Sequence, residues 1–196
     1  MILPIVAYGD PVLRKVCQPI GPEYPGLETL LENMWETMYQ ANGVGLAAPQ
    51  IGLAIRLFMV DTSPFADDDE LLPEEQEALR GFKRVFINAE MEEETGTAWA
   101  FNEGCLSIPD IREDVKRPDT IRLRYRDVAF NERVETFDGL LARVIQHEYD
   151  HIEGILFTDK LSPLKKRLLK GKLANIAKGK IQVDYRMRFP LEKRSR

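Results

Sequence analysis

The only two histidines of this chain, His147 and His151, stand four positions apart around Glu148. Residues at this spacing share one face of an α-helix, with Cβ atoms about 5–6 Å apart. Two imidazoles placed in this way can bind one metal ion, and the glutamate between them lies close enough to take a proton from water at that ion. The pattern therefore predicts a helix that carries a metal site.

The residues around this motif predict a buried helix over residues 139–154. Asp138 is a suitable N-cap, and Gly154 can end the helix in the left-handed conformation. Apolar residues spread around much of the circumference, at Leu140, Val144, Ile145, Tyr149 and Ile152. This distribution is typical of a central helix, where a chance match would bury two imidazoles and a carboxylate without partners at high cost. We therefore favour metal binding over coincidence.

Length and composition are typical of one globular domain with its own core. Hydrophobic residues make up 44% of the chain and charged residues 30%, which argues against a disordered or a membrane class. No apolar run approaches the ~18 residues of a membrane span, and the N-terminus lacks the features of a secretory signal. Cys17 and Cys105 form no disulfide framework. We expect a cytoplasmic protein with neither a membrane partner nor a specific DNA partner.

Charge is distributed unevenly along the chain. Residues 161–196 hold twelve Lys and Arg against two acids, a net charge of +10, so the first 160 residues carry −15. A basic tail on an acidic body is compatible with an anionic partner. On composition alone, a solvated helix face explains the tail equally well and more simply.

Hydrophobic periodicity predicts the remaining elements. Amphipathic helices are expected at 25–42 and from Pro163 to about 178, the second capped by Ser162. Residues 43–52 contain three glycines and Pro49, and we expect a shaped loop with no regular element there. The predicted strands are 55–61, 84–90, 120–126, 133–137 and 181–189.

Helices and strands do not alternate regularly, so the predicted class is α+β, with mostly antiparallel sheets packed around the metal-binding helix. We find no repeat and no linker, and we expect a single domain over residues 1–196. Two segments stand out within it. Residues 62–82 are an acidic, proline-punctuated and exposed excursion with a short helix after Pro73, and residues 161–196 are the basic tail.

A catalytic metal site usually has three protein ligands and one position open to solvent. The known extensions of zinc proteases are absent, because Phe157 stands where a third histidine would be and no helical glutamate follows. Cys105 is the better candidate, since the small-residue turn 102–109 can present its thiolate. Cys17 fits a buried free cysteine. A zinc endopeptidase of the His-Glu-x-x-His type and a structural metal protein remain alternatives.

Three segments resemble the signature motifs of peptide deformylases and occur in the family's order. They are Gly-Val-Gly-Leu-Ala-Ala-Pro-Gln at 43–50, Glu-Gly-Cys-Leu-Ser at 103–107 and Gln-His-Glu-Tyr-Asp-His at 146–151. The resemblance covers most of the chain and is weakest at 62–82 and in the last fifteen residues. It implies a metal-dependent hydrolase that removes the formyl group from N-formyl-methionyl peptides.

The resemblance also implies roles for individual residues. Glu148 would be the general base and then the acid that serves the departing amine. The oxyanion would be bound by the side-chain amide of Gln50 and the backbone N–H of Leu106. The implied metal ligands are Cys105, His147 and His151.

Substrate contacts follow from the same resemblance. Gly45 would pair with the extended peptide, and Arg112 would help to position it. Arg143 departs from the family's pattern, in which bacterial relatives often carry an apolar residue there, so it either faces away from the methionine pocket or alters the pocket's shape. The expected walls of this pocket are Val44, Leu140 and Val144.

Cysteine with two histidines suits zinc or ferrous iron equally well. The resemblance favours Fe²⁺, with nickel, cobalt or zinc as substitutes. In some relatives a basic C-terminal helix contacts the ribosome, although the strand expected at 181–189 differs from such helical tails. We predict weak, salt-dependent ribosome binding through Lys165, Lys166, Arg167 and Lys170.

Overall fold

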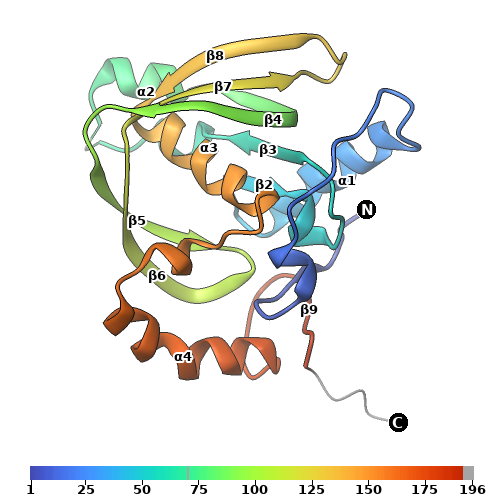
Figure 1. Ribbon diagram of the computed structural model, residues 1–196, viewed down its shortest axis with the longest axis vertical. Helices are drawn as coiled ribbons and strands as arrows, with labels where there is room; N and C mark the ends of the chain where they lie inside the picture. Colours follow the sequence, from blue (N-terminus) through green and yellow to red (C-terminus); the bar gives the residue numbers. More distant parts are fainter. Residues whose placement is uncertain (70, 192–196) are drawn as a thin grey trace.

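A five-stranded antiparallel sheet forms one side of the molecule (Figure 1). The computed structural model describes residues 1–69 and 71–191. Every neighbouring pair in this sheet is antiparallel, and β2 is one of its two edge strands. In spatial order the strands are β2 (Gly45–Ala47), β3 (Leu57–Asp61), β4 (Lys83–Thr95), β7 (Thr120–Arg126) and β8 (Glu132–Asp138).

Two smaller pairs of strands complete the β-structure of the described residues. An antiparallel hairpin joins β5 (Trp99–Cys105) to β6 (Ile108–Arg117), with a register shift between Gly104 and Cys105. Near the two ends of the chain, β1 (Ile5–Val6) pairs in parallel with β9 (Met187–Arg188). Residues far apart in the sequence therefore meet at this second pair.

Helix α3 (Gly139–Ile152) lies between the five-stranded sheet and the β5–β6 hairpin (Figure 1). Its buried side chains, among them Val144 and Ile145, pack in one core cluster with Phe58 and Phe86 of the sheet. The other helices are α1 (Leu27–Gln40), α2 (Pro73–Leu79) and α4 (Pro163–Ala177). Short 3₁₀ helices span Pro11–Arg14, Ala48–Ile51, Ser63–Phe65 and Phe157–Lys160.

This architecture confirms the predicted α+β class, with antiparallel sheets around a central helix in a single domain. Gly154 adopts the predicted left-handed conformation, and a Cβ at this position would also lie 2.7 Å from the Arg14 carbonyl oxygen. Ser162 caps α4 by accepting a hydrogen bond from the Lys165 N–H. Asp138 occupies the predicted N-cap position of α3, but its side chain makes no capping hydrogen bond.

Three expectations about individual segments need correction. Residues 45–47 form a strand rather than a loop, because they pair with β3. The predicted strand at 181–189 is reduced to Met187–Arg188. The acidic excursion is anchored rather than wholly exposed, since Ala66 and Leu79 are buried, and its residue 70 lies outside the described chain.

The β5–β6 hairpin is the largest element that the sequence did not predict. Only the turn between its strands, at Leu106 and Ser107, matches the expected loop over 102–109. Buried positions of the hairpin include Glu103 and Arg117. Because charged residues occupy inward positions, the alternation that normally indicates a strand is broken.

None of the helices in the described ranges combines the length and the hydropathy that crossing a membrane requires.

Candidate metal centre

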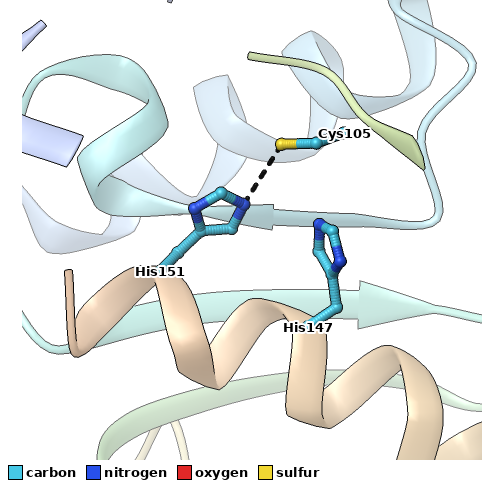
Figure 2. Close-up of side chains that lie close together, drawn as sticks. All are labelled: Cys105, His147 and His151. Carbon is cyan, nitrogen blue, oxygen red and sulfur yellow. Dashed lines mark hydrogen bonds between the residues drawn. The ribbon is translucent and has the colours of Figure 1, made fainter. Parts of the chain in front are cut away.

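Three potential ligands converge where the β5–β6 hairpin meets α3. Cys105 is the last residue of β5, and His147 and His151 lie one turn apart on α3. Figure 2 shows both imidazole rings projecting from the helix toward the cysteine sulfur. Their ligand atoms all lie within 4.8 Å of one another, and the Cys105 Sγ is 3.3 Å from the His151 Nε2. The arrangement presents three donors to one point.

The donors fit a divalent transition metal. A thiolate with two imidazoles is a set that zinc and iron accept. The His147 Nδ1 lies 2.9 Å from a carboxylate oxygen of Glu103, which accepts its proton and leaves the Nε2 lone pair free for a metal. Burial and the nearby His147 lower the pKa of His151, which favours the neutral, ligating form. One carboxylate oxygen of Glu148 is buried beside these ligands and has no partner within the described chain.

Glu103 holds His147 in place from β5. The carboxylate also accepts hydrogen bonds from the Arg117 guanidinium at 2.7 and 2.9 Å and from Arg143 at 3.0 Å. Burial alone would raise the pKa of Glu103, but the hydrogen bonds from Arg117 and His147 outweigh it and hold the pKa far below its usual value. Glu103 is therefore a carboxylate, able to accept a proton from the imidazole of His147.

The same cluster of charges extends to a second position on α3. The Arg117 Nη1 lies 2.6 Å from a carboxylate oxygen of Asp150, which also pairs with Lys160 at 3.3 Å. Both Arg117 and Asp150 are buried. Arg117 of β6 therefore connects the cysteine-bearing strand to the histidine-bearing helix through two carboxylates.

Glu148 lies on α3 between the two histidines and faces Gly45 of β2. A Cβ on Gly45 would overlap the Glu148 Oε1, so the absence of a side chain there makes room for the carboxylate. Burial raises the pKa of Glu148 to about 7. A carboxyl group with this pKa can exchange a proton near neutral pH.

Two further polar groups border Cys105. The Gln50 Oε1 accepts a hydrogen bond from the Ala47 N–H at 2.8 Å, which turns the Nε2 toward the Cys105 Sγ at 3.5 Å and the Ser107 Oγ at 3.4 Å. Leu106 follows Cys105 directly in the turn of the hairpin. The side-chain amide of Gln50 is therefore held in one orientation next to the candidate ligand.

A cavity of about 670 Å³ opens beside these residues. His151 is buried next to Cys105 and does not line this cavity. Leu140, an expected wall of the methionine pocket, does not line it either, so it is not part of the candidate pocket. Arg143 and Phe101 line the cavity instead. The other candidate residues all line the cavity: Val44, Gly45, Gln50, Cys105, Leu106, Arg112, Val144, His147 and Glu148.

Arg143 lines the cavity rather than facing away from it, although its side chain is only 1% exposed. Its guanidinium carbon lies 4.5 Å from the ring centre of Trp99 and 5.9 Å from that of Phe101. Its Nη atoms donate to Glu103 and to the carbonyls of Val115 and Trp99. The hairpin thus neutralises and covers this charge, which stands where an apolar residue was expected.

Sequence reasoning assigned no role to several of these residues. The role of Glu103 could have been predicted. Metal-bound histidines usually donate a hydrogen bond to a carboxylate, and this acid stands two positions before Cys105. Arg117 and Asp150 gave no such signal, since their contacts form only when β6 packs on α3.

Comparisons with known proteins agree with this geometry. Residues 2–167 match the family model described as polypeptide deformylase. The chain is 63% identical to the peptide deformylase of Christiangramia forsetii and 61% identical to that of Flavobacterium johnsoniae, each over 196 residues and the full length of both proteins.

Solved structures show the same likeness. The peptide deformylase of Thermus thermophilus superposes with a TM-score of 0.76 at 38% identity, covering 90% of this chain and 98% of that one. That of Legionella pneumophila gives a TM-score of 0.75 at 37% identity, covering 89% and 95%.

Replacing Arg117 by methionine is expected to lower the free energy of unfolding by about 3–5 kcal/mol, because two buried carboxylates each lose their arginine partner. The matched control is Arg122→Met, which removes an exposed arginine paired with Glu92 and should cost less than about 1 kcal/mol. Urea unfolding at one fixed zinc concentration measures both. Equal losses would contradict the role of the buried cluster.

Replacing Glu148 by glutamine is expected to stabilise the metal-free protein at alkaline pH. The folded-state pKa of about 7 exceeds the ordinary 4.5, so the stability that this group contributes is present below pH 4.5 and is lost as the pH rises to 7. Above that range the ionised carboxylate lowers the free energy of unfolding by roughly 3 kcal/mol. Urea unfolding should show that the variant's free energy of unfolding exceeds that of wild type by a margin that grows from pH 5 to pH 8. For the exposed control Glu93→Gln, the difference from wild type should stay constant over this range.

Proposed function

The chain belongs to the polypeptide deformylase family, and from this premise we propose how its own residues perform the family's reaction. The enzyme is a metal-dependent hydrolase that removes the N-formyl group from nascent peptides. One observation carries the assignment of residues: three ligand atoms lie within 4.8 Å of one another beside a buried carboxylate. A zinc endopeptidase is not favoured.

Cys105, His147 and His151 are the proposed metal ligands. Ferrous iron is the proposed native metal, with zinc, nickel or cobalt as substitutes, because a thiolate and two imidazoles accept each of these ions. When bound, the metal supplies a Lewis acid that makes water nucleophilic near neutral pH. Glu103 keeps the His147 ring oriented by accepting its Nδ1 proton.

Glu148 is the proposed proton carrier. Its Oε2 has no partner within the described chain, so it is available to take a proton from the attacking water. The same oxygen then returns the proton to the amine that leaves when the formyl group is cleaved. Gly45 provides the space that this carboxylate occupies.

Two donors are proposed to stabilise the oxyanion that forms on the formyl oxygen. One is the Gln50 Nε2, whose direction is fixed because the Oε1 accepts from Ala47. The other is the backbone N–H of Leu106, next to Cys105. Donors that are oriented before the reaction begins stabilise developing charge without reorganisation.

The peptide is proposed to bind along the edge of the five-stranded sheet. Gly45 lies in β2, an edge strand whose backbone can pair with an extended peptide. Val44 and Val144 line the cavity and are the proposed walls for the methionine side chain. Arg112, held by hydrogen bonds to Asn102, stands at the same cavity as the proposed positioning group for the peptide.

The basic helix α4 is the proposed ribosome contact. Lys166, Arg167 and Lys170 are exposed on it, while Lys165 pairs with Glu113 at 2.6 Å. Because its substrate emerges from the ribosome, the enzyme is also proposed to be cytoplasmic.

Residues 1–196 are proposed to form one domain that includes the excursion 62–82 and the tail 161–196, because β1 and β9 bring the two ends of the described chain together.

Replacing Glu148 by alanine is expected to lower kcat on formyl-Met-Ala-Ser about 10²- to 10⁴-fold, because the proton carrier is lost. Metal content should remain that of wild type, whereas Cys105→Ala should lose metal. Glu93→Ala, on an exposed part of β4, serves as the control with unchanged turnover. Anaerobic purification with metal analysis of the same samples gives both readouts. Unchanged turnover of the Glu148 variant would refute the proposed mechanism.

Reversing the charges of Lys166, Arg167 and Lys170 to glutamate is expected to abolish salt-dependent co-sedimentation with ribosomes. The control carries the same change of net charge on β7, at the exposed residues Arg122 and Arg124 and at the half-buried Arg126. Control and wild type should bind alike. Equal co-sedimentation of the α4 variant at low salt would exclude this helix as the contact.

A further inference from the structure

The chain beyond α4 returns to the cavity that holds the candidate site. Gln182, Val183, Asp184 and Tyr185 all line this cavity, on the wall that includes Leu106. They lie past residue 167, where the match to the family model ends. The family's matched region therefore leaves out a segment that borders the reacting groups.

This returning segment is held firmly on its C-terminal side. The Ile5 N–H donates to the Arg186 carbonyl and the Ala7 N–H donates to the Arg188 carbonyl, both at 2.9 Å. Met187 and Phe189 pack against buried core residues. Figure 1 shows this end of the chain running beside the N-terminal segment. Tyr185 therefore stands two residues before the fixed pairing of β9 with β1.

Tyr185 reaches the turn that carries the proposed oxyanion donor. Its Oη donates a hydrogen bond of 2.7 Å to the carbonyl oxygen of Leu106. Its ring is half-buried against the core cluster that also contains Met38 and Leu46, and the Leu106 side chain packs against the same cluster. Both the hydroxyl and the ring of Tyr185 thus act on the residue that follows Cys105.

The rest of this turn is held by contacts to Ser107. The Tyr8 N–H donates to the Ser107 carbonyl at 2.8 Å, and the Gln50 Nε2 lies 3.4 Å from the Ser107 Oγ. Neither contact restrains the Leu106 carbonyl directly. Among the described residues, Tyr185 supplies the side-chain hydrogen bond to the Leu106 carbonyl.

We propose that Tyr185 is a positioning residue for deformylation, which fixes the backbone of Leu106 so that its N–H points to the developing oxyanion. This inference rests on the proposed role of Leu106. Small displacements of a positioned donor reduce the rate, because the donor stabilises only the charge that develops in the transition state. A purely structural role would instead anchor the C-terminal segment without affecting the chemical step.

The test is Tyr185→Phe, which keeps the ring and removes the hydroxyl. In the zinc- or cobalt-loaded enzyme we expect kcat on formyl-Met-Ala-Ser to fall about 10- to 100-fold while KM changes less than about twofold. The visible spectrum of the cobalt form should match wild type, because the thiolate and both imidazoles are untouched.

The matched control is Tyr125→Phe. It removes a hydroxyl that also makes a 2.7 Å hydrogen bond, to Glu135 on the five-stranded sheet away from the cavity. We expect a similar loss of stability for both variants and wild-type kcat for the control. A Tyr185 variant with wild-type kcat would overturn the inference, as would an altered cobalt spectrum, which would assign the effect to Cys105. Failure of the proposed function is distinguishable, since wild type itself would then not deformylate the peptide.

Discussion

The buried ion pair between Glu103 and Arg117 joins the two elements that carry the proposed metal ligands. Glu103 stands two positions before Cys105 on β5 and accepts the Nδ1 proton of His147 on α3. Arg117 connects this carboxylate to Asp150, one turn further along the same helix. Buried charges are costly unless they are paired, so these ion pairs favour the relative position of hairpin and helix in which all of them form. The distance between the thiolate and the imidazoles follows from that position.

The proposed proton carrier, Glu148, depends on a second constraint, which is steric rather than electrostatic. Glu148 is buried against β2, and its carboxylate fills the space where a side chain of residue 45 would begin. Gly45, the proposed pairing residue for the peptide, thus also makes room for the proposed base. Burial raises the pKa of Glu148 to about 7, whereas Glu103, surrounded by cations, remains ionised. Two neighbouring carboxyl groups are thereby given different proton affinities by their surroundings.

The sequence predicted those parts of the site whose geometry is local. The spacing of His147 and His151 is a property of one helix, and the helix itself has a continuous apolar pattern. The β5–β6 hairpin was missed because charged residues occupy its inward positions. Hydrophobic periodicity cannot identify a buried charged residue whose partner lies on another element. For the same reason, the sequence did not decide whether Arg143 faces the methionine pocket. Its stacking on Trp99 and its bond to Glu103 exist only after the hairpin has packed on α3.

The turn after Cys105 shows why a short motif is necessary for this site but not sufficient. Cys105 contacts His151, and the turn contacts Gln50 and Tyr185, at sequence separations of 46, 57 and 79 residues. The entropic cost of closing such loops grows only with the logarithm of their length, so distant segments can be recruited at little extra cost. Gln50 lies in the 3₁₀ helix Ala48–Ile51 and His151 in α3, and Tyr185 stands two residues before β9. Regular structure positions a side chain more accurately than a free loop does. The position of the turn therefore depends on the elements around it. A family motif considered alone omits the hydrogen bond that Tyr185 contributes.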